Sequence, residues 1–306
     1  EPFTGALTIQ SKYNQSDKSK STLSVSRDKQ SVKIQREVKT YVKGLVRFSD
    51  YAVTPGKSKK QAIAQSCLHE WLSVWAKADA LTTKNTTKTG IAVRKWTLAS
   101  IAFVAIKTER MSQGQWAINT TEKQWLSNLA SLVIEDYNPR LKSDFKYFNN
   151  HDHWAAWAVF STGMLLDNKE LMGWGKRVFD KALTLAVVDM KKQYAYFPNE
   201  IARKQLAANY THFSLTPLVL LAHYLPKEGF SVSNQQQKTI SYMANFASDI
   251  VLKPNAVKHI VKVKQSSVKD YKLAWLLPYL KEHPSHKRAR ALYEDRGGKV
   301  DGYSQL

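Results

Sequence analysis

The sequence predicts an all-helical protein, a single domain of stacked helical hairpins that close into a toroid or barrel of helix pairs. Apolar residues recur at helical spacing along most of the chain, and the alternating pattern typical of strands is nearly absent. Only 12 glycines occur in 306 residues. About nine helices of similar length, with no change of composition between them, favour one domain over several, and the lack of a fixed period argues against a regular solenoid.

The predicted helices follow one another closely from about residue 33 onward. The first carries the apolar stripe Ile34, Val38, Tyr41, Val42, Leu45 and Val46. Pro55-Gly56 ends it. The others cover about 60–80, 92–108, 122–136, 151–167, 170–190, 200–224, 236–252 and 270–282. Residues 1–30 are polar and irregular, so we expect a mobile segment that carries functional contacts.

The charge balance is the most unusual property of the composition. Lysine and arginine number 46 against 25 aspartate and glutamate residues, which gives a formal net charge of +21. Such a surplus attracts polyanions at long range, so nucleic acid, acidic polysaccharide and anionic membrane are the candidate partners. The lysines are scattered and do not form one basic run with interleaved aromatic residues, which disfavours nucleic acid.

The single cysteine and the start of the chain limit the protein further. Cys67 has no partner for an intramolecular disulfide and cannot build a cysteine-based metal site. It lies in an apolar helical pattern, so we expect a small buried side chain. No apolar run approaches the roughly 20 residues that span a bilayer. The chain begins at Glu1 without methionine, which fits a processed or trimmed protein from which a signal peptide has been removed.

The stretch from Tyr147 to Trp157 brings amide, imidazole and indole groups to the start of an apolar helix. Asn149 and Asn150 suit a loop or a helix N-cap, because asparagine accepts hydrogen bonds from the first free helical amides. His151 then lies one turn from Trp154 on the same face. Taken alone, this stretch fits a capped core helix with a hydrogen-bonded histidine better than it fits a site.

A second informative stretch covers residues 197–213. Arg203 and Tyr210 are seven residues apart, so a continuous helix would direct both to one face, about 10 Å apart along its axis. Glu200 lies one turn before Arg203 and could fix its guanidinium. Taken alone, this stretch also fits an exposed ion pair with a tyrosine packed at its rim.

Considered together, the two stretches meet the needs of β-elimination on a uronic-acid polysaccharide. The carboxylate next to C5 must be neutralised, and arginine and asparagine are suitable donors. A base must remove the C5 proton, and an acid must protonate the departing O4. His151 and Tyr210 can fill these two roles, with Arg203 lowering the pKa of Tyr210. The reaction requires no metal and no organic cofactor.

Other chemistries fit less well. A glycosidase needs two carboxylates across the scissile bond. Asp152 and Glu200 lack that context, and we expect Asp152 to be an exposed first-turn acid favoured by the helix dipole. His151 and His153 point to different sides of a helix and no further ligand cluster accompanies them, so a zinc site is not predicted. The chain also lacks a glycine-rich phosphate loop.

At this point the residues resemble a known family, the mannuronate-specific alginate lyases of polysaccharide lyase family five. Asn149-Asn150-His151-x-x-Trp154 resembles the family's Asn-Asn-His motif, and Glu200-x-x-Arg203 with Tyr210 resembles its Arg/Tyr catalytic helix. Three further stretches are similar to a core helix, the lid loop and the carboxyl-terminal region of the family: Cys67-x-x-x-Trp71 through Leu81, Ser11-Lys12-Tyr13, and Tyr293-x-x-Arg296-Gly297-Gly298.

The resemblance implies a fold and a setting. It implies an incomplete α/α toroid with a cleft and a mobile N-terminal lid. It also implies a periplasmic or secreted protein, expected to be a monomer, that acts on alginate.

The resemblance also implies roles for individual residues. Asn150 and Arg203 would neutralise the carboxylate. His151 would be the base or its neutralising partner, and Tyr210 the acid, or both acid and base, because the C5 hydrogen and O4 of mannuronate lie on one face of the ring. The implied substrate contacts are Tyr13 and Lys12 in the lid, Trp154 at a sugar subsite, Asn209, and Arg296 at an acidic substituent.

Three departures from the family pattern leave the subsite preference open. His153 stands where the family commonly has tyrosine, and Asn209 stands where it often has histidine. The run Lys299-Val300-Asp301-Gly302-Tyr303 replaces an apolar tail. Two alternatives therefore remain. One is the same elimination on polyglucuronate or hyaluronate, and the other is a non-catalytic helical protein that binds polyanions.

Overall fold

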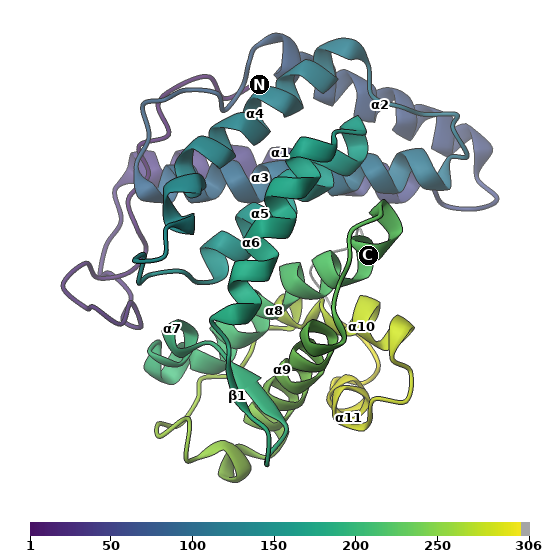
Figure 1. The fold of residues 1–306 in the computed structure, drawn as a ribbon. Coiled ribbons are helices and arrows are strands. Elements are labelled where there is room, and N and C mark those ends of the chain that lie inside the picture. Colours follow the sequence, from purple (N-terminus) through teal and green to yellow (C-terminus); the bar gives the residue numbers. More distant parts are fainter. Residues whose placement is uncertain (301–306) are drawn as a thin grey trace.

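The chain is predominantly helical in a computed structural model that describes residues 1–300 (Figure 1). The helices are α1 (Lys29–Ala52), α2 (Ser58–Lys77), α3 (Lys88–Met111), α4 (Thr120–Tyr137), α5 (Asn150–Leu166), α6 (Lys169–Thr184), α7 (Pro198–Ile201), α8 (Ala207–Tyr224), α9 (Asn234–Leu252), α10 (Leu276–Glu282) and α11 (Lys287–Asp295). The predicted helical class is confirmed. Most of the atypical run at 299–303 lies outside the described residues.

One short β-hairpin interrupts the helices. Strands β1 (Val187–Asp189) and β2 (Tyr194–Tyr196) pair antiparallel, so the prediction of a helix that continues to residue 190 is wrong. Two consecutive β-branched valines at 187 and 188 favour an extended chain. The Tyr194 hydroxyl donates to Asp249 on α9 at 2.8 Å, and this bond fixes the hairpin against the C-terminal helices.

Helix α5 lies at the centre of the molecule, in contact with α3, α4, α6 and α8 (Figure 1). Its sequence is apolar on every side, which is typical of a helix that is surrounded by others. Trp157 and Phe160 are completely buried in it. A helix held on all sides is a rigid support, and its N-terminus carries the Asn-Asn-His stretch.

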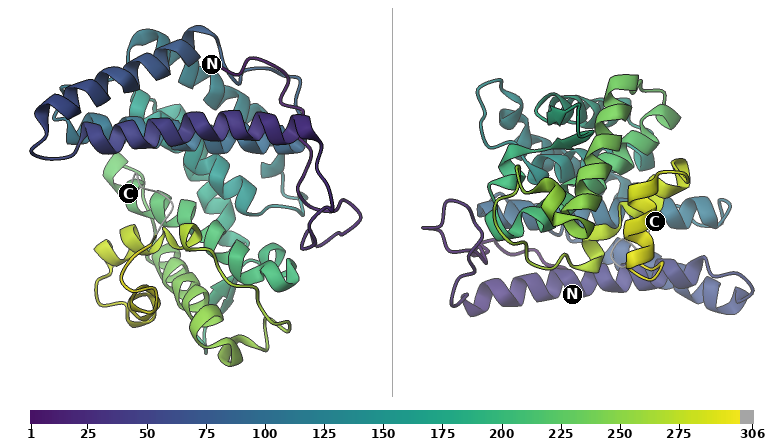
Figure 2. Two further views of the ribbon diagram at one scale, coloured as in Figure 1. Left: turned by 180° about the vertical axis from the view of Figure 1, so that it is seen from behind. Right: turned by 90° about the horizontal axis from the view of Figure 1, so that it is seen from below.

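The two halves of the chain form two groups of helices around this centre. Helices α1 and α2 form a hairpin along one edge, and α8 to α11 gather on the opposite side of the molecule (Figure 2). Within residues 1–300, α3 is the one helix whose length and composition would suit a membrane span. Most of its apolar window, 72%, is buried inside the protein, as expected for a core helix.

The N-terminal segment is fixed at its base and reaches across the molecule at its tip. Leu7 and Ile9 are buried, and Leu7 N–H donates to the Asn85 carbonyl at 2.9 Å. Beyond this anchor the loop extends toward the region after α7 (Figure 1). There Arg203 Nη2 donates to the Lys20 carbonyl at 2.7 Å. The predicted lid segment therefore lies against the predicted Arg/Tyr stretch.

Cys67 is free and only partly buried on α2, so the expectation of a fully buried side chain is wrong. The next residue, Leu68, is the one that is fully buried.

The lid anchor depends on a glycine of α3, and a pair of substitutions tests this. A Cβ at Gly90 would lie 1.9 Å from the Leu7 carbonyl oxygen, so Gly90→Ala must displace the N-terminal segment around Leu7. We expect a loss of about 1–3 kcal/mol in the free energy of unfolding, measured by urea denaturation, and faster proteolysis within residues 1–28.

The control substitution is Gly173→Ala on α6, where the new Cβ meets only Arg177 Nη1 at 3.9 Å. Alanine suits a helix interior better than glycine, so this variant should gain about 0.5–1 kcal/mol. Equal stability of the two variants would contradict the close approach at Gly90.

Candidate active site

The N-terminus of α5 is held by a capping box. The Asn149 side chain accepts from His151 N–H at 2.9 Å, and Asp152 accepts from Asn149 N–H at 2.8 Å. Asp152 is buried and bound to Arg140, with Nε to Oδ1 at 2.5 Å, so the prediction of an exposed acid is wrong. These bonds fix the backbone of Asn150 and His151, the two residues that the motif singles out.

Asn150 is bound to Glu200, a fully buried carboxylate 50 residues later. Glu200 Oε1 accepts from Asn150 N–H at 2.6 Å and from Asn150 Nδ2 at 3.0 Å, and Oε2 lies 3.1 Å from Nδ2. The prediction that Glu200 fixes the Arg203 guanidinium is therefore wrong, because both carboxylate oxygens bond to Asn150. Asn150 Oδ1 is buried without a hydrogen-bond partner.

Burial raises the pKa of Glu200 to about 7, against the opposing effects of the Asn150 hydrogen bonds and the Arg203 charge. An acid with such a pKa exchanges its proton in the neutral range.

Arg203 lies in a break between α7 and α8, and the continuous helix predicted there is wrong. Lys204 adopts a positive φ of 51°, and α8 begins only at Ala207. The break turns the guanidinium back onto the ring of Tyr210, with its Cζ 3.7 Å from the ring centroid. The two side chains are thus in direct contact.

Tyr210 is covered by the lid. Its hydroxyl is hydrogen-bonded to the hydroxyl of Tyr13, and the two ring centroids are 6.4 Å apart. Burial raises the pKa of Tyr210 well above its ordinary value, and the charge of Arg203 acts in the opposite direction. Arg203 thus lowers the pKa of Tyr210 as expected, but in this closed arrangement burial raises that pKa by more.

His151 is bound from the side of α3 by a residue that the sequence reasoning missed. Lys95 is completely buried, and its Nζ lies 3.0 Å from His151 Nδ1 and 3.0 Å from the His151 carbonyl oxygen. Trp96 faces the same imidazole, with ring centroids 5.5 Å apart. The available signal was a basic pair, Arg94 and Lys95, in a stretch of α3 from 91 to 106 that carries no other charge.

Lys272 is a second missed residue, and its sequence context carries no comparable signal. Its Nζ lies 4.9 Å from the Tyr210 ring centroid. Burial and the neighbouring charges of Lys12 and Arg203 lower the pKa of Lys272 to about 8. It therefore keeps its positive charge at neutral pH, next to the tyrosine.

Two aromatic positions of the motif belong to the core. Trp154 is 3% exposed and donates its indole N–H to the Phe213 carbonyl at 2.9 Å, so its ring is packed inside the closed protein, and the sugar subsite expected there stays a prediction. His153 is buried, and its Nδ1 lies 2.7 Å from Ser214 Oγ. Burial lowers the pKa of His153 to about 3, which makes it a neutral packing residue.

The other predicted contacts lie at the edges of the site or away from it. Lys12 is exposed on the lid, with Nζ 5.1 Å from the Tyr13 ring centroid. Asn209 is buried and donates to the Ser266 and Ser267 carbonyls at 3.4 and 3.1 Å, so its amide holds a loop and is not free to contact substrate.

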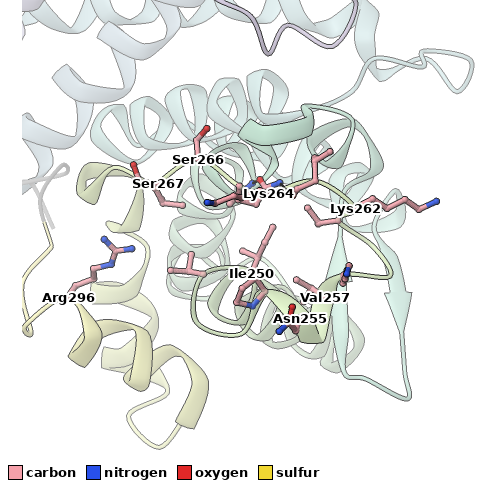
Figure 3. A pocket seen from close by; sticks show the side chains of 16 residues that line it. Ile250, Asn255, Val257, Lys262, Lys264, Ser266, Ser267 and Arg296 are labelled. Atoms are coloured by element: carbon pink, nitrogen blue, oxygen red, sulfur yellow. Dashed lines mark hydrogen bonds between the residues drawn. The ribbon is translucent and has the colours of Figure 1, made fainter.

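Arg296 lines a separate cavity of about 420 Å³ together with Ile250, Val257 and Lys264 (Figure 3). None of Asn150, His151, Arg203 and Tyr210 lines this cavity. Among residues 1–300, no group of three or more histidine, cysteine, aspartate or glutamate side chains is arranged to hold a metal ion.

Comparison with known proteins identifies related chains along most of the sequence. The family model described as "Alginate lyase" matches residues 8–257. An alginate lyase of Cobetia marina is 28% identical over 285 residues, covering 91% of this chain and 73% of the relative. An alginate lyase of Pseudomonas fluorescens strain Pf-5 is 29% identical, covering 91% of this chain and 74% of the relative.

The fold is similar to that of solved structures. The crystal structure of alginate lyase A1-III from Sphingomonas species A1 superposes with a TM-score of 0.73 at 19% identity, covering 94% of this chain and 79% of that one. An A1-III variant complexed with a tetrasaccharide gives a TM-score of 0.69 at 19% identity, covering 90% and 75%. This likeness confirms the predicted α/α toroid as the fold class.

The buried Glu200 predicts a specific dependence of stability on pH. The folded state holds the Glu200 proton up to about pH 7, whereas the unfolded chain releases it near 4.5. Stability therefore falls as pH rises through this window, by about 3 kcal/mol from this group. We expect Glu200→Gln to remove that slope, measured as unfolding free energy between pH 4.5 and 8.

The matched control is Glu135→Gln, because Glu135 is exposed in its ion pair with Lys84. Its stability curve should run parallel to that of the wild type. A Glu200→Gln curve that also stays parallel would contradict the raised pKa.

Proposed function

The chain belongs to the alginate lyase family of polysaccharide lyases, and we propose that it cleaves the poly-β-D-mannuronate of alginate by β-elimination. The observation that carries this proposal is the contact between Arg203 and Tyr210 beside the capped Asn150-His151 corner of α5. The net charge of +21 supports a polyanionic substrate.

Carboxylate neutralisation is proposed to come from Arg203 and Asn150. Arg203 supplies a full positive charge. Asn150 can donate when Glu200 is protonated, because Glu200 then donates its O–H to Asn150 Oδ1 and the Asn150 amide N–H groups turn to the substrate. The Glu200 pKa of about 7 makes this state accessible at neutral pH.

Proton transfer is proposed to centre on Tyr210. As a phenolate, Tyr210 accepts the C5 proton. The electron pair of the broken C5–H bond forms the C4=C5 double bond, and the C4–O4 bond breaks. The phenol then returns the proton to O4, so no oxidant or reductant is needed. Arg203 and Lys272 lie 3.7 and 4.9 Å from the Tyr210 ring centroid and favour the phenolate.

The lid is proposed to open before substrate enters. Tyr13 holds the hydroxyl of Tyr210, so the sugar O4 must replace this contact. Once the lid closes again, Tyr13 and the neighbouring Lys12 would lie over the bound chain and exclude water from the reaction.

The activity is tested on polymannuronate by following the ultraviolet absorbance of the unsaturated product. Tyr210→Phe removes the hydroxyl that moves the proton, so we expect turnover to fall by about 10²-fold to 10⁴-fold while polymer binding stays close to wild type. Tyr242→Phe on α9 is the matched control and should keep full turnover.

A panel of polyguluronate, polyglucuronate and hyaluronate tests the substrate preference. Faster cleavage of any of these polymers would overturn the mannuronate assignment. No absorbance rise on any uronate polymer, together with unchanged behaviour of Tyr210→Phe, would instead identify a polyanion-binding protein without lyase activity.

A further inference from the structure

We propose that Lys95 is a positioning residue that holds His151 as the neutral Nε2–H tautomer, so that His151 donates a hydrogen bond to the uronate carboxylate and does not remove the C5 proton. The inference rests on the proposed function, because it assigns a step of that reaction. It concerns the choice between base and neutralising partner, which the motif alone leaves open for His151.

The burial of Lys95 calls for an explanation. Removing an ammonium group from water is costly unless it is paired. Asp152, the acid whose charge acts on Lys95, is bound to Arg140 and to the Asn149 amide. The hydrogen-bond partners of Lys95 are instead the ring and the carbonyl oxygen of His151, both at 3.0 Å. The lysine is thus directed at one residue, and that residue belongs to the candidate site.

The chemistry of an ammonium group fixes the direction of these bonds. It has three N–H donors and no acceptor, so His151 Nδ1 must be the acceptor. The rings of Tyr137 and Trp96 lie 4.8 and 4.9 Å from Lys95 Nζ and stabilise its charge. A neutral imidazole that accepts at Nδ1 carries its hydrogen on Nε2. Neither ring nitrogen then has a free lone pair with which to take a proton.

The surrounding charges keep the ring neutral. Burial lowers the pKa of His151 well below its ordinary value, and the positive charges of Lys95, Arg140 and Arg203 lower it further. Burial also lowers the pKa of Lys95 well below its ordinary value; Asp152 acts against this shift, and Arg140 adds to it. If Lys95 were a neutral amine that accepts from Nδ1–H, His151 Nε2 would be free to act as a base. The two arrangements therefore differ in one observable, the position of the imidazole proton.

The neighbouring Arg94 provides a matched control on the same helix. It is also buried, but its partners are structural. Its Nε donates to the Leu81 carbonyl at 3.0 Å, it donates to the Thr83 carbonyl, and it pairs with Asp136 at 3.2 Å. Arg94→Met should lower stability without changing the His151 tautomer.

The direct test is ¹⁵N NMR of protein labelled in its histidine rings, with the His151 signals identified by their loss in His151→Gln. We expect an unprotonated Nδ1 and a protonated Nε2 in the wild type and in Arg94→Met. In Lys95→Met, which has similar length but no N–H, the tautomers should mix. A protonated Nδ1 in the wild type would overturn the proposal, even if Lys95→Met failed to fold.

Kinetics on polymannuronate provide a second readout. Loss of a positioning partner typically costs about 10-fold to 100-fold, so Lys95→Met should lose that much in kcat with little change in KM. His151→Gln keeps an N–H donor but cannot act as a base, so it should stay well above His151→Ala. Equal inactivity of these two variants, or wild-type kcat in Lys95→Met, would contradict the inference. Failure of the wild type to cleave any uronate would contradict the proposed function and leave the NMR result standing.

Discussion

The candidate site depends on one buried contact, the carboxylate of Glu200 against the N-terminus of α5. Glu200 accepts from the backbone and the side chain of Asn150, where the free amides and the dipole of the helix favour negative charge. The contact joins two stretches that are 50 residues apart. It holds the Asn150-His151 corner next to the break that contains Arg203.

The sequence could predict what depends on local spacing. Asn149 is the cap that its residue type suggests, and α5 begins within one residue of the expected position, because capping and periodicity are local properties. The partners of Trp154 and Asn209 could not be predicted, since periodicity reports that a residue is buried but not which neighbour covers it. Periodicity also did not reveal the helix break at Arg203. Lys95 was missed for a related reason: its partner comes from another helix, and only the packing of α3 against α5 joins them.

The site carries more positive than negative charge. Lys95, Arg140, Arg203 and Lys272 all influence it, whereas the two buried acids, Asp152 and Glu200, already bond to the N-terminus of α5. Mutual repulsion of these cations costs stability in the empty protein. An arriving uronate relieves that repulsion. Binding energy and folding energy are thus linked through the same side chains. Burial is the main cause of the lowered pKa values of Lys95 and Lys272, and neighbouring cations lower both further.

The bond between Tyr13 and Tyr210 makes the lid a competitor of the substrate. In the closed protein, Tyr13 of the lid is hydrogen-bonded to the hydroxyl that the sugar must reach. The apparent affinity for substrate is therefore the intrinsic affinity multiplied by the fraction of molecules whose lid is open. The contact between Tyr13 and Tyr210 must therefore break before a sugar can reach the Tyr210 hydroxyl. Under the proposed mechanism a long polymer, which makes many contacts, would compete with this contact better than a short product would.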